Sequence, residues 1–248
     1  MNLTLLSAVD GEILYDPAKD SRLSKHIQHY GGHSLNDKKQ LAYFLSETAV
    51  FVDVGAHLGT FSIPLSKIAA HVHACEPTPD TAATLEKNIA LNDCSNISLH
   101  RCVIGAAPGH ARGRAGGKNR GQTFYEPTES QENSIPGKRL SDICDHADVI
   151  KIDAEGMELR ILEGNREFIA KTRPVLFIEF SRKQLERFGD SALGLHRFFY
   201  QLGYKTSFNH GHSHYPASPL DIRTAYLPLF TFARHNRDIL AIPKEKAR

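Results

Sequence analysis

The feature that most constrains the fold of this chain is a short apolar run that leads through a glycine turn into a helical pattern. Residues 50–54 are rich in β-branched and aromatic side chains and run into a turn at 55–59, after which Phe61, Leu65 and Ile68 recur at helical spacing. A short apolar run bounded by glycine is typical of a buried strand. The order of strand, tight turn and helix predicts the first unit of an α/β fold.

The same pairing continues along the chain. Residues 71–76 are expected to form a second strand, with Thr78 as the N-cap and Pro79 as the first residue of the following helix. Strands that alternate with helices predict a mostly parallel sheet with helices on both faces, whose ligands bind at the carboxyl ends of the strands. Further strands are expected at 97–104, 149–153, 175–180, 204–208 and 238–242, and further helices at 37–45, 140–143, 155–164 and 195–202.

Length and composition favour one domain with elaborations. The chain has 248 residues, 41% of them hydrophobic, which is the balance of a folded globular protein. Residues 1–36 are weakly periodic and are expected to form an N-terminal extension to a main domain at 37–248. Two segments interrupt the alternation: a glycine- and arginine-rich insert at 105–136, expected as a loop or loose hairpin, and a loop at 209–236.

The net charge, the apolar runs and the cysteine spacing limit the binding partners and the compartment that can be expected. Lys and Arg number 30 and Asp and Glu 28, and the resulting net charge of +2 gives no indication of nucleic-acid or membrane binding. No run approaches the roughly 18 apolar residues of a membrane helix, and the first residues lack the basic start of an export signal. The four cysteines are scattered without a C-x-x-C spacing, which fits a reducing compartment. A cytoplasmic location is therefore expected.

The motif that carries chemistry is Asp53-x-Gly55-x-x-x-Gly59, with Glu76 at the end of the next expected strand. Glycine at 55 and 59 lets the backbone turn sharply and approach a ligand, and the helix that follows presents unpaired N–H groups. An acid one strand later is where nucleotide-binding α/β folds bind a ribose diol. Together these residues predict an adenosine-bearing ligand at the first crossover. The alternative is a tight turn that binds no ligand.

The loop chemistry favours one ligand over another. Dinucleotide folds use G-x-G-x-x-G, whereas this loop offers G-x-x-x-G. A carboxylate such as Asp53 repels a pyrophosphate but suits a ligand with an ammonium group. S-adenosylmethionine, with its amino acid moiety and sulfonium, satisfies this charge pattern. A nicotinamide-dependent oxidoreductase on the same sheet and a non-catalytic module that binds an adenosine ligand remain the alternatives.

A second acidic motif follows the strand expected at 149–153. Asp153 and Glu155 stand at its end, and Glu158 follows three residues later. A helix N-terminus favours Glu155 and Glu158, but this does not account for Asp153. At the edge of the crevice, one carboxylate can orient a cofactor and another can accept a proton. Lys151, near the end of the same strand, is expected to form a salt bridge and not to act as a base.

Several segments together resemble a known family: 52–59, Glu76-Pro77 with Leu85 and the helix end at 87–92, 139–142, 150–158, 174–179 and 238–244. The chain resembles the FkbM family of S-adenosylmethionine-dependent methyltransferases, most specifically in the block at 150–158. The resemblance implies a seven-stranded, mostly parallel class I (Rossmann-like) methyltransferase fold at 37–248 and O-methylation of a hydroxyl on a sugar, glycan or polyketide-type small molecule. His57 stands where the family commonly carries asparagine.

The residues and the resemblance together give a set of expected site residues. Asp153 is expected to orient the cofactor at the reacting centre, and Glu155 to accept the proton of the acceptor hydroxyl. S-adenosyl-L-methionine is the expected cofactor, S-adenosyl-L-homocysteine its product, and no metal is expected. The residues expected to bind the cofactor are Asp53, Gly55, Ala56, His57, Gly59, Thr60, Phe61, Glu76, Pro77 and Asp153.

Two clusters stay outside this assignment. The alternating His210, His212 and His214 have a spacing that would line one face of a strand as a metal site, but Gly211 favours a loop that contacts the acceptor. The expected partner is a small-molecule or glycan acceptor; nucleic acid and membrane insertion are not expected, and a homo-oligomer is compatible. The basic residues of the insert, which could hold a phosphate-bearing acceptor or be a solvated loop, are Arg112, Arg114, Lys118 and Arg120.

Overall fold

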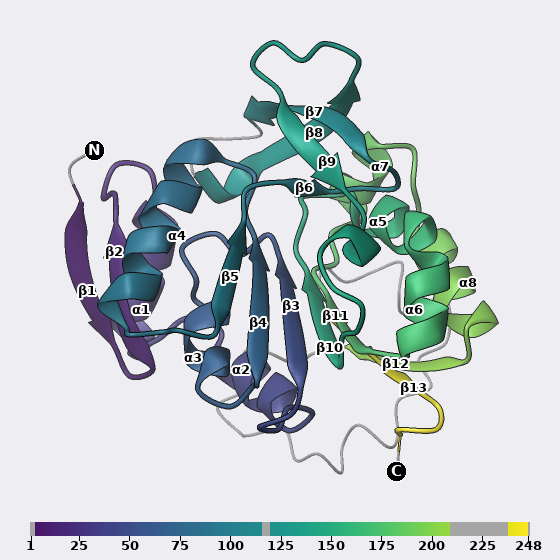
Figure 1. Ribbon diagram of the computed structural model, residues 1–248, viewed down its shortest axis with the longest axis horizontal. Helices are drawn as coiled ribbons and strands as arrows, with labels where there is room; N and C mark the ends of the chain where they lie inside the picture. Colours follow the sequence, from purple (N-terminus) through teal and green to yellow (C-terminus); the bar gives the residue numbers. More distant parts are fainter. Residues whose placement is uncertain (1–2, 116–119, 209–237, 248) are drawn as a thin grey trace.

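The main sheet has seven strands in the part of the chain that the computed structural model describes, residues 3–115, 120–208 and 238–247 (Figure 1). Six of these strands run in the same direction, β13 runs antiparallel to both of its neighbours, and the expected mostly parallel sheet is confirmed. In spatial order the strands are β12 (Tyr204–Phe208), β13 (Ile239–Pro243), β11 (Val175–Ile178), β10 (Val149–Ile152), β3 (Val50–Val54), β4 (His71–Cys75) and β5 (Ile97–His100).

Helices cover both faces of this sheet, as expected, because alternate side chains of each strand point to opposite faces. Val52 packs in a core with residues of α5, α6 and α8, whereas its neighbour Phe51 packs in a core with residues of α2 and α3. The helices are α1 (Ser21–Tyr30), α2 (Leu35–Ala42), α3 (Ser62–Ser66), α4 (Pro79–Leu91), α5 (Glu158–Gly164), α6 (Arg166–Thr172), α7 (Arg182–Arg187) and α8 (Ala192–Gln201).

The expected strand at 97–104 divides into two. Its first part is β5 at the edge of the main sheet, and its second part, β6 (Val103–Ile104), belongs to a separate four-stranded sheet. The insert forms the hairpin of β7 (Gly109–Ala115) and β8 (Thr123–Thr128) in that second sheet, with β9 (Ile135–Lys138) between β6 and β7. The prediction of a hairpin in the insert is therefore confirmed, whereas the prediction of a single strand at 97–104 is wrong.

The N-terminal residues form a hairpin of β1 (Thr4–Ala8) and β2 (Gly11–Tyr15), followed by α1. Asn88 of α4 and Asn92, which follows the helix, hold this hairpin: Asn88 accepts a hydrogen bond from the Leu14 amide at 2.7 Å and Asn92 one from the Glu12 amide at 2.9 Å. Apolar residues of β2 also pack in one core cluster with residues of the main domain. Residues 1–36 thus contact the domain closely, and the expected boundary at 36 stays a prediction.

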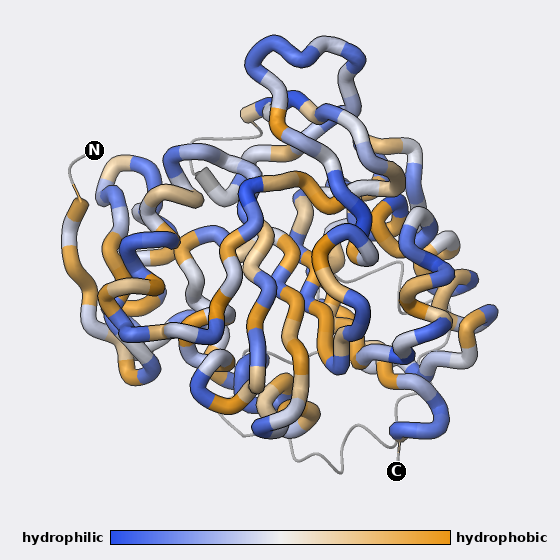
Figure 2. Tube along the Cα trace, in the orientation of Figure 1, coloured by the Kyte–Doolittle hydropathy of each residue, from blue (hydrophilic) through white to orange (hydrophobic). Residues whose placement is uncertain are grey.

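The helix expected at 155–164 begins three residues later, at Glu158. Glu155 and Gly156 have φ values of +53° and +111°, which end the strand in a left-handed turn that no α-helix can include. Figure 2 shows that apolar residues concentrate in the main-sheet strands, whereas the connection between β8 and β9 is hydrophilic. None of the described helices is long and apolar enough to cross a membrane. The expected loop at 209–236, with its histidines, lies outside the described residues.

Candidate active site

The turn after β3 requires glycine at two positions. Gly55 has a φ of +80°, and a Cβ atom there would stand 1.9 Å from the backbone oxygen of Asp153. Gly59 has a φ of +88°, and its Cβ would stand 2.6 Å from Cδ1 of Leu85. His57 also has a positive φ, of +50°, in the left-handed region where asparagine and histidine are enriched. Backbone sterics thus account for the glycine pattern without invoking a ligand, although they bring the loop close to the end of β10.

Glu76 follows β4 and is held against this turn. Its Oε2 accepts a hydrogen bond from the His57 amide at 3.0 Å, and its Oε1 accepts one from the Thr78 amide at 2.8 Å. The side chain is buried, and burial raises the pKa of Glu76 to about 7. A carboxylate fixed in this way at a strand end can bind a ribose diol with its remaining lone pairs.

A buried ion-pair network lies behind the turn. Nζ of Lys151 is 3.3 Å from Oδ1 of Asp53 and 3.4 Å from Oδ2 of Asp153, and Ser62 donates a hydrogen bond to Asp53 at 2.7 Å. Burial would lower the pKa of Lys151, but the charges of Asp53 and Asp153 outweigh it and hold that pKa above its usual range. The expected salt bridge of Lys151 is thereby confirmed.

Two of the expected site residues do not line the cavity. Asp53 is 0% exposed and its carboxylate pairs with Lys151, so it does not face the space where a ligand ammonium would lie. Gly59 packs against Leu85 and Ile63, which places it behind the wall of the site. Both residues therefore lie behind the residues that line the cavity.

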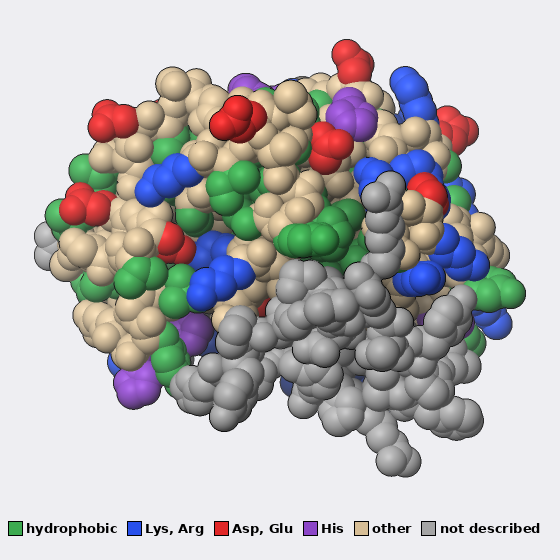
Figure 3. Space-filling model, turned by 90° about the horizontal axis from the view of Figure 1, so that it is seen from below, with side chains coloured by type: hydrophobic (Ala, Val, Ile, Leu, Met, Phe, Trp, Pro, Cys, Tyr) green, Lys and Arg blue, Asp and Glu red, His purple; other side chains and the backbone are tan. Residues whose placement is uncertain are grey.

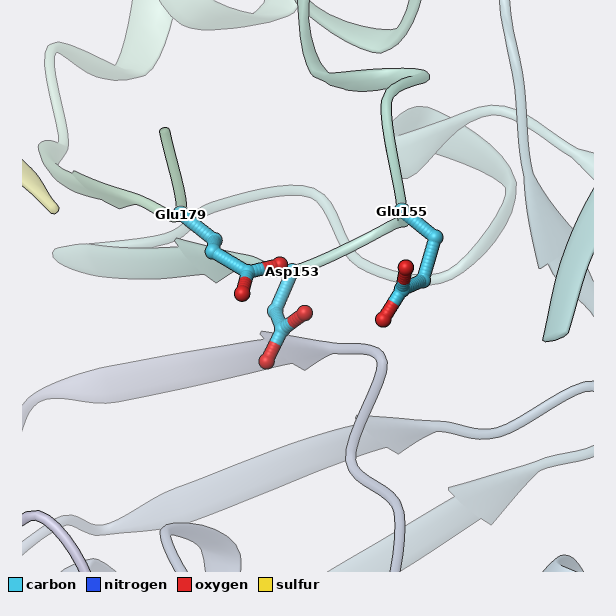
Figure 4. Close-up of side chains that lie close together, drawn as sticks. All are labelled: Asp153, Glu155 and Glu179. Atoms are coloured by element: carbon cyan, nitrogen blue, oxygen red, sulfur yellow. The ribbon is translucent and has the colours of Figure 1, made fainter. Parts of the chain in front are cut away.

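Three carboxylates meet at the carboxyl ends of β10 and β11 (Figure 4). Asp153 and Glu155 follow β10 and Glu179 follows β11, and each offers an oxygen within 4.8 Å of the other two. Gln184 donates a hydrogen bond to Glu155. In the described part of the chain, this cluster has the geometry to hold a metal ion, and the expectation of no metal stays a prediction.

The surroundings of these three acids shift their pKa values in different directions. Burial would raise the pKa of Asp153, but the charge of Lys151 outweighs it and lowers that pKa below its usual value. The charge of Asp153, together with burial, raises the pKa of Glu179 well above its usual value. Burial and the same charge raise the pKa of Glu155 to about 7. The cluster therefore favours the ionised form of Asp153 and the protonated form of Glu179, while the pKa of Glu155 lies near neutral pH.

A cavity of about 720 Å³ opens above these groups, within the range of small-molecule sites. Its floor is the strand ends, and α1 and the β7–β8 hairpin form walls that the sequence did not predict. The hairpin is joined to the start of α4 by a 2.9 Å hydrogen bond between Tyr125 and Thr78. The expected site residues that line the cavity are Gly55, Ala56, His57, Thr60, Phe61, Glu76, Pro77, Asp153 and Glu155.

Sequence reasoning missed Glu179, although a signal was present. Like Glu76 and Asp153, it is an acid directly after an apolar strand, and parallel strands bring such acids to one edge. Two basic residues of the insert, Arg112 and Arg114, do not line the cavity: Arg114 pairs with Glu126 at 3.1 Å and Arg112 donates to the Glu132 carbonyl. Lys118 lies outside the described residues, as do the histidines of the 209–236 loop.

Comparisons with known proteins agree with this geometry. The model of one protein family, described as the methyltransferase FkbM domain, matches residues 53–206. A crystal structure of methyltransferase FkbM from Methylobacillus flagellatus superposes with a TM-score of 0.53 at 21% identity, covering 79% of this chain and 44% of that one. This likeness confirms the expected fold class.

Two curated proteins also match. Over 102 residues the chain is 30% identical to the tRNA wybutosine-synthesizing protein 2 homolog of Danio rerio, covering 37% of this chain and 24% of that protein. Over 146 residues it is 24% identical to Methyltransferase 1 of Beauveria bassiana, covering 48% and 59%. The chain therefore spans between 24% and 59% of the length of these two relatives.

Proposed function

The chain belongs to the FkbM methyltransferase domain family, and from that premise we propose that it transfers a methyl group to a hydroxyl of a sugar, glycan or polyketide-type small molecule. The cofactor of this family is S-adenosylmethionine, as the sequence predicted. Bound in the cavity, it supplies a sulfonium-activated methyl group. The protein then has mainly to align the acceptor oxygen with that group.

The observation that carries the proposal is Glu76, a buried carboxylate held by two backbone amides beside the glycine turn. Its position after β4 suits the two hydroxyls of a ribose. The ionised Asp153 nearby places negative charge at the end of β10, where it would favour the cationic amino acid and sulfonium part of the cofactor. We therefore assign ribose binding to Glu76 and cofactor orientation to Asp153.

Glu155 is the group we assign to proton acceptance. It lines the cavity, lies in the carboxylate cluster beside Asp153, and has a pKa of about 7. A general base is most effective when its pKa lies near the working pH. A hydrogen bond from Gln184 restricts the movement of this carboxylate.

An RNA acceptor is the second candidate function. The relative from Danio rerio that is 30% identical over 102 residues carries tRNA in its name. The net charge of +2 and the small-molecule size of the cavity favour the first candidate. Incubating the protein with unfractionated tRNA and labelled S-adenosylmethionine decides between them, because label in the RNA would support the second candidate.

Calorimetric titration with S-adenosylhomocysteine tests the cofactor site. We expect the wild-type protein to bind it and not to bind NAD, and Glu76→Ala to weaken binding by at least about 100-fold, since two charge-assisted hydrogen bonds are lost. The matched control is Glu86→Ala, an exposed glutamate of α4 whose loss should leave the affinity unchanged. Tighter binding of NAD would instead support an oxidoreductase, and cofactor binding without turnover on any acceptor would support a non-catalytic module.

A further inference from the structure

Helix α1 forms one wall of the cavity and lies outside the family match at 53–206. The helix has two distinct faces. Ser24 and Ile27 are buried, and the helix contacts β1 of the N-terminal hairpin. The other face, at the spacing of successive helical turns, lines the cavity with Arg22, Lys25, His26, His29 and Tyr30.

This cavity-lining face of α1 is basic. The helix contains no acidic residue between Ser21 and Tyr30. Within the described ranges, neither Arg22 nor Lys25 forms an ion pair, whereas Lys19 before the helix pairs with Asp80 at 3.3 Å. Among the residues that the structure describes, these two cations line the cavity without an ion-pair partner, while Asp20, the acid just before the helix, lies 3.6 Å from His57.

The opposite wall of the cavity is acidic. Glu76, Asp153, Glu155 and Glu179 line it at the strand ends, together with Lys151, the partner of Asp153. The strand ends therefore place four acids and one lysine where a cationic cofactor would lie, whereas the α1 side carries Arg22 and Lys25 beside one acid, Asp20. Such an arrangement attracts a negative group to the helix side.

His33, just after α1, adds a second polar group to this wall. It lines the cavity, and its ring lies 5.3 Å from that of His26. Its Nδ1 is buried and has no hydrogen-bond partner among the described residues. Burial and the nearby His26 and Lys38 lower the pKa of His33 to about 3, so the ring is neutral and can donate or accept a hydrogen bond. A polar ligand atom in the cavity would satisfy it.

We propose that the methyl acceptor is an anionic small molecule whose phosphate or carboxylate group is held by Arg22 and Lys25 of α1. The inference rests on the proposed methyltransferase function and adds the charge class of the substrate. In this arrangement the negative group binds at the helix wall, and a hydroxyl elsewhere on the acceptor faces Glu155 across the cavity. Figure 3 shows one outer face, on which acidic and basic side chains both occur among uncharged ones, with several Lys and Arg side chains gathered toward its right edge.

Binding measurements in saturating S-adenosylhomocysteine test this proposal. The probes are uridine diphosphate glucose, glucose 6-phosphate, glucuronate and, as the neutral reference, glucose. We expect at least one anionic probe to bind more tightly than glucose, with affinity that falls as salt is raised. The double substitution Arg22→Glu and Lys25→Glu should weaken that binding by about 10-fold or more, because each phosphate or carboxylate contact is charge-assisted. The phosphate and carboxylate probes distinguish the two sources of negative charge.

The control variant is Lys87→Glu, which reverses an exposed lysine of α4 outside the cavity and should leave all affinities unchanged. Equal binding of glucose and of every anionic probe would overturn the proposal. So would loss of S-adenosylhomocysteine binding in the double variant, since Arg22 and Lys25 would then serve the cofactor carboxylate. Preferential binding of unfractionated tRNA would overturn it in favour of RNA. Failure of the wild-type protein to bind S-adenosylhomocysteine would instead count against the proposed function itself.

Discussion

Removing the buried cation beneath the site should destabilise the protein strongly. Lys151 is 4% exposed and is shared by Asp53 and Asp153 at 3.3 and 3.4 Å, so Lys151→Met leaves two carboxylates without their counter-charge. Breaking a buried ion pair from one side costs about 3–5 kcal/mol. At roughly 2–4 °C per kcal/mol for a chain of this size, the melting temperature should fall by about 6–20 °C.

The pH dependence of this loss follows from the carboxylate it leaves behind. In the wild-type protein the pKa of Asp153 is lowered, so Asp153 stabilises the fold above its unfolded pKa and loses that contribution as the pH falls. Without Lys151, burial raises the pKa of Asp153, and its ionised form then opposes folding until it is protonated. The difference in unfolding free energy between variant and wild type should therefore be larger at about pH 8 than at about pH 5.

Urea unfolding at the two pH values measures this difference directly. The double variant Lys151→Met with Asp53→Asn should recover part of the loss, because one of the two stranded charges is gone and Asn can still accept the hydrogen bond from Ser62. Lys171→Met, at an exposed lysine of α6, should change stability by at most about 0.5 kcal/mol. A loss below about 1 kcal/mol for Lys151→Met, or one that does not shrink at the lower pH, would refute the reasoning.

Three further outcomes are expected. Methyl transfer by the wild-type protein should rise as the pH passes through about 7, because only ionised Glu155 accepts a proton, and Glu155→Gln should remove this rise while sparing S-adenosylhomocysteine binding in calorimetry. Gly55→Ala should prevent folding or cofactor binding, because its Cβ would stand 1.9 Å from a backbone oxygen, whereas Gly189→Ala, also at positive φ but in open space, should cost only about 1 kcal/mol in thermal unfolding. Tyr125→Phe removes the hydrogen bond to Thr78 and should weaken S-adenosylhomocysteine binding measurably, by up to about 10-fold. An unchanged affinity would show that this contact does not position the residues after β4 for the cofactor.

The sequence predicts the main sheet well because its signals are local. A five-residue run with four apolar residues, followed by glycine, as at 50–55, carries both the strand and its end within one short window. Glu76 and Asp153 could be placed at the same edge for a related reason, since parallel strands of an α/β sheet bring their carboxyl ends together. The same rule applied to Glu179 would have completed the carboxylate cluster.

The walls of the cavity were not predictable in this way. Helix α1 is recognised as a wall only when β1 and β2 are docked on α4 through Asn88 and Asn92, contacts that join residues far apart in the chain. The β7–β8 hairpin is rich in glycine, which weakens the strand signal, and its pairing with β9 is what stabilises it. Asp53 was expected to bind the ligand, and only the three-dimensional structure shows that it forms an ion pair with Lys151 instead.

The antiparallel strand β13 has a consequence for how the chain acquires its structure. All five of its residues are buried, and it pairs with β11 on one side and β12 on the other. A growing polypeptide that has reached only β12 therefore exposes two unpaired strand edges, which invite association with other chains. The protein should be most prone to aggregation and to chaperone binding in that interval of synthesis. A truncation that removes residues 239–243 should leave the two strand edges unpaired in the finished chain as well.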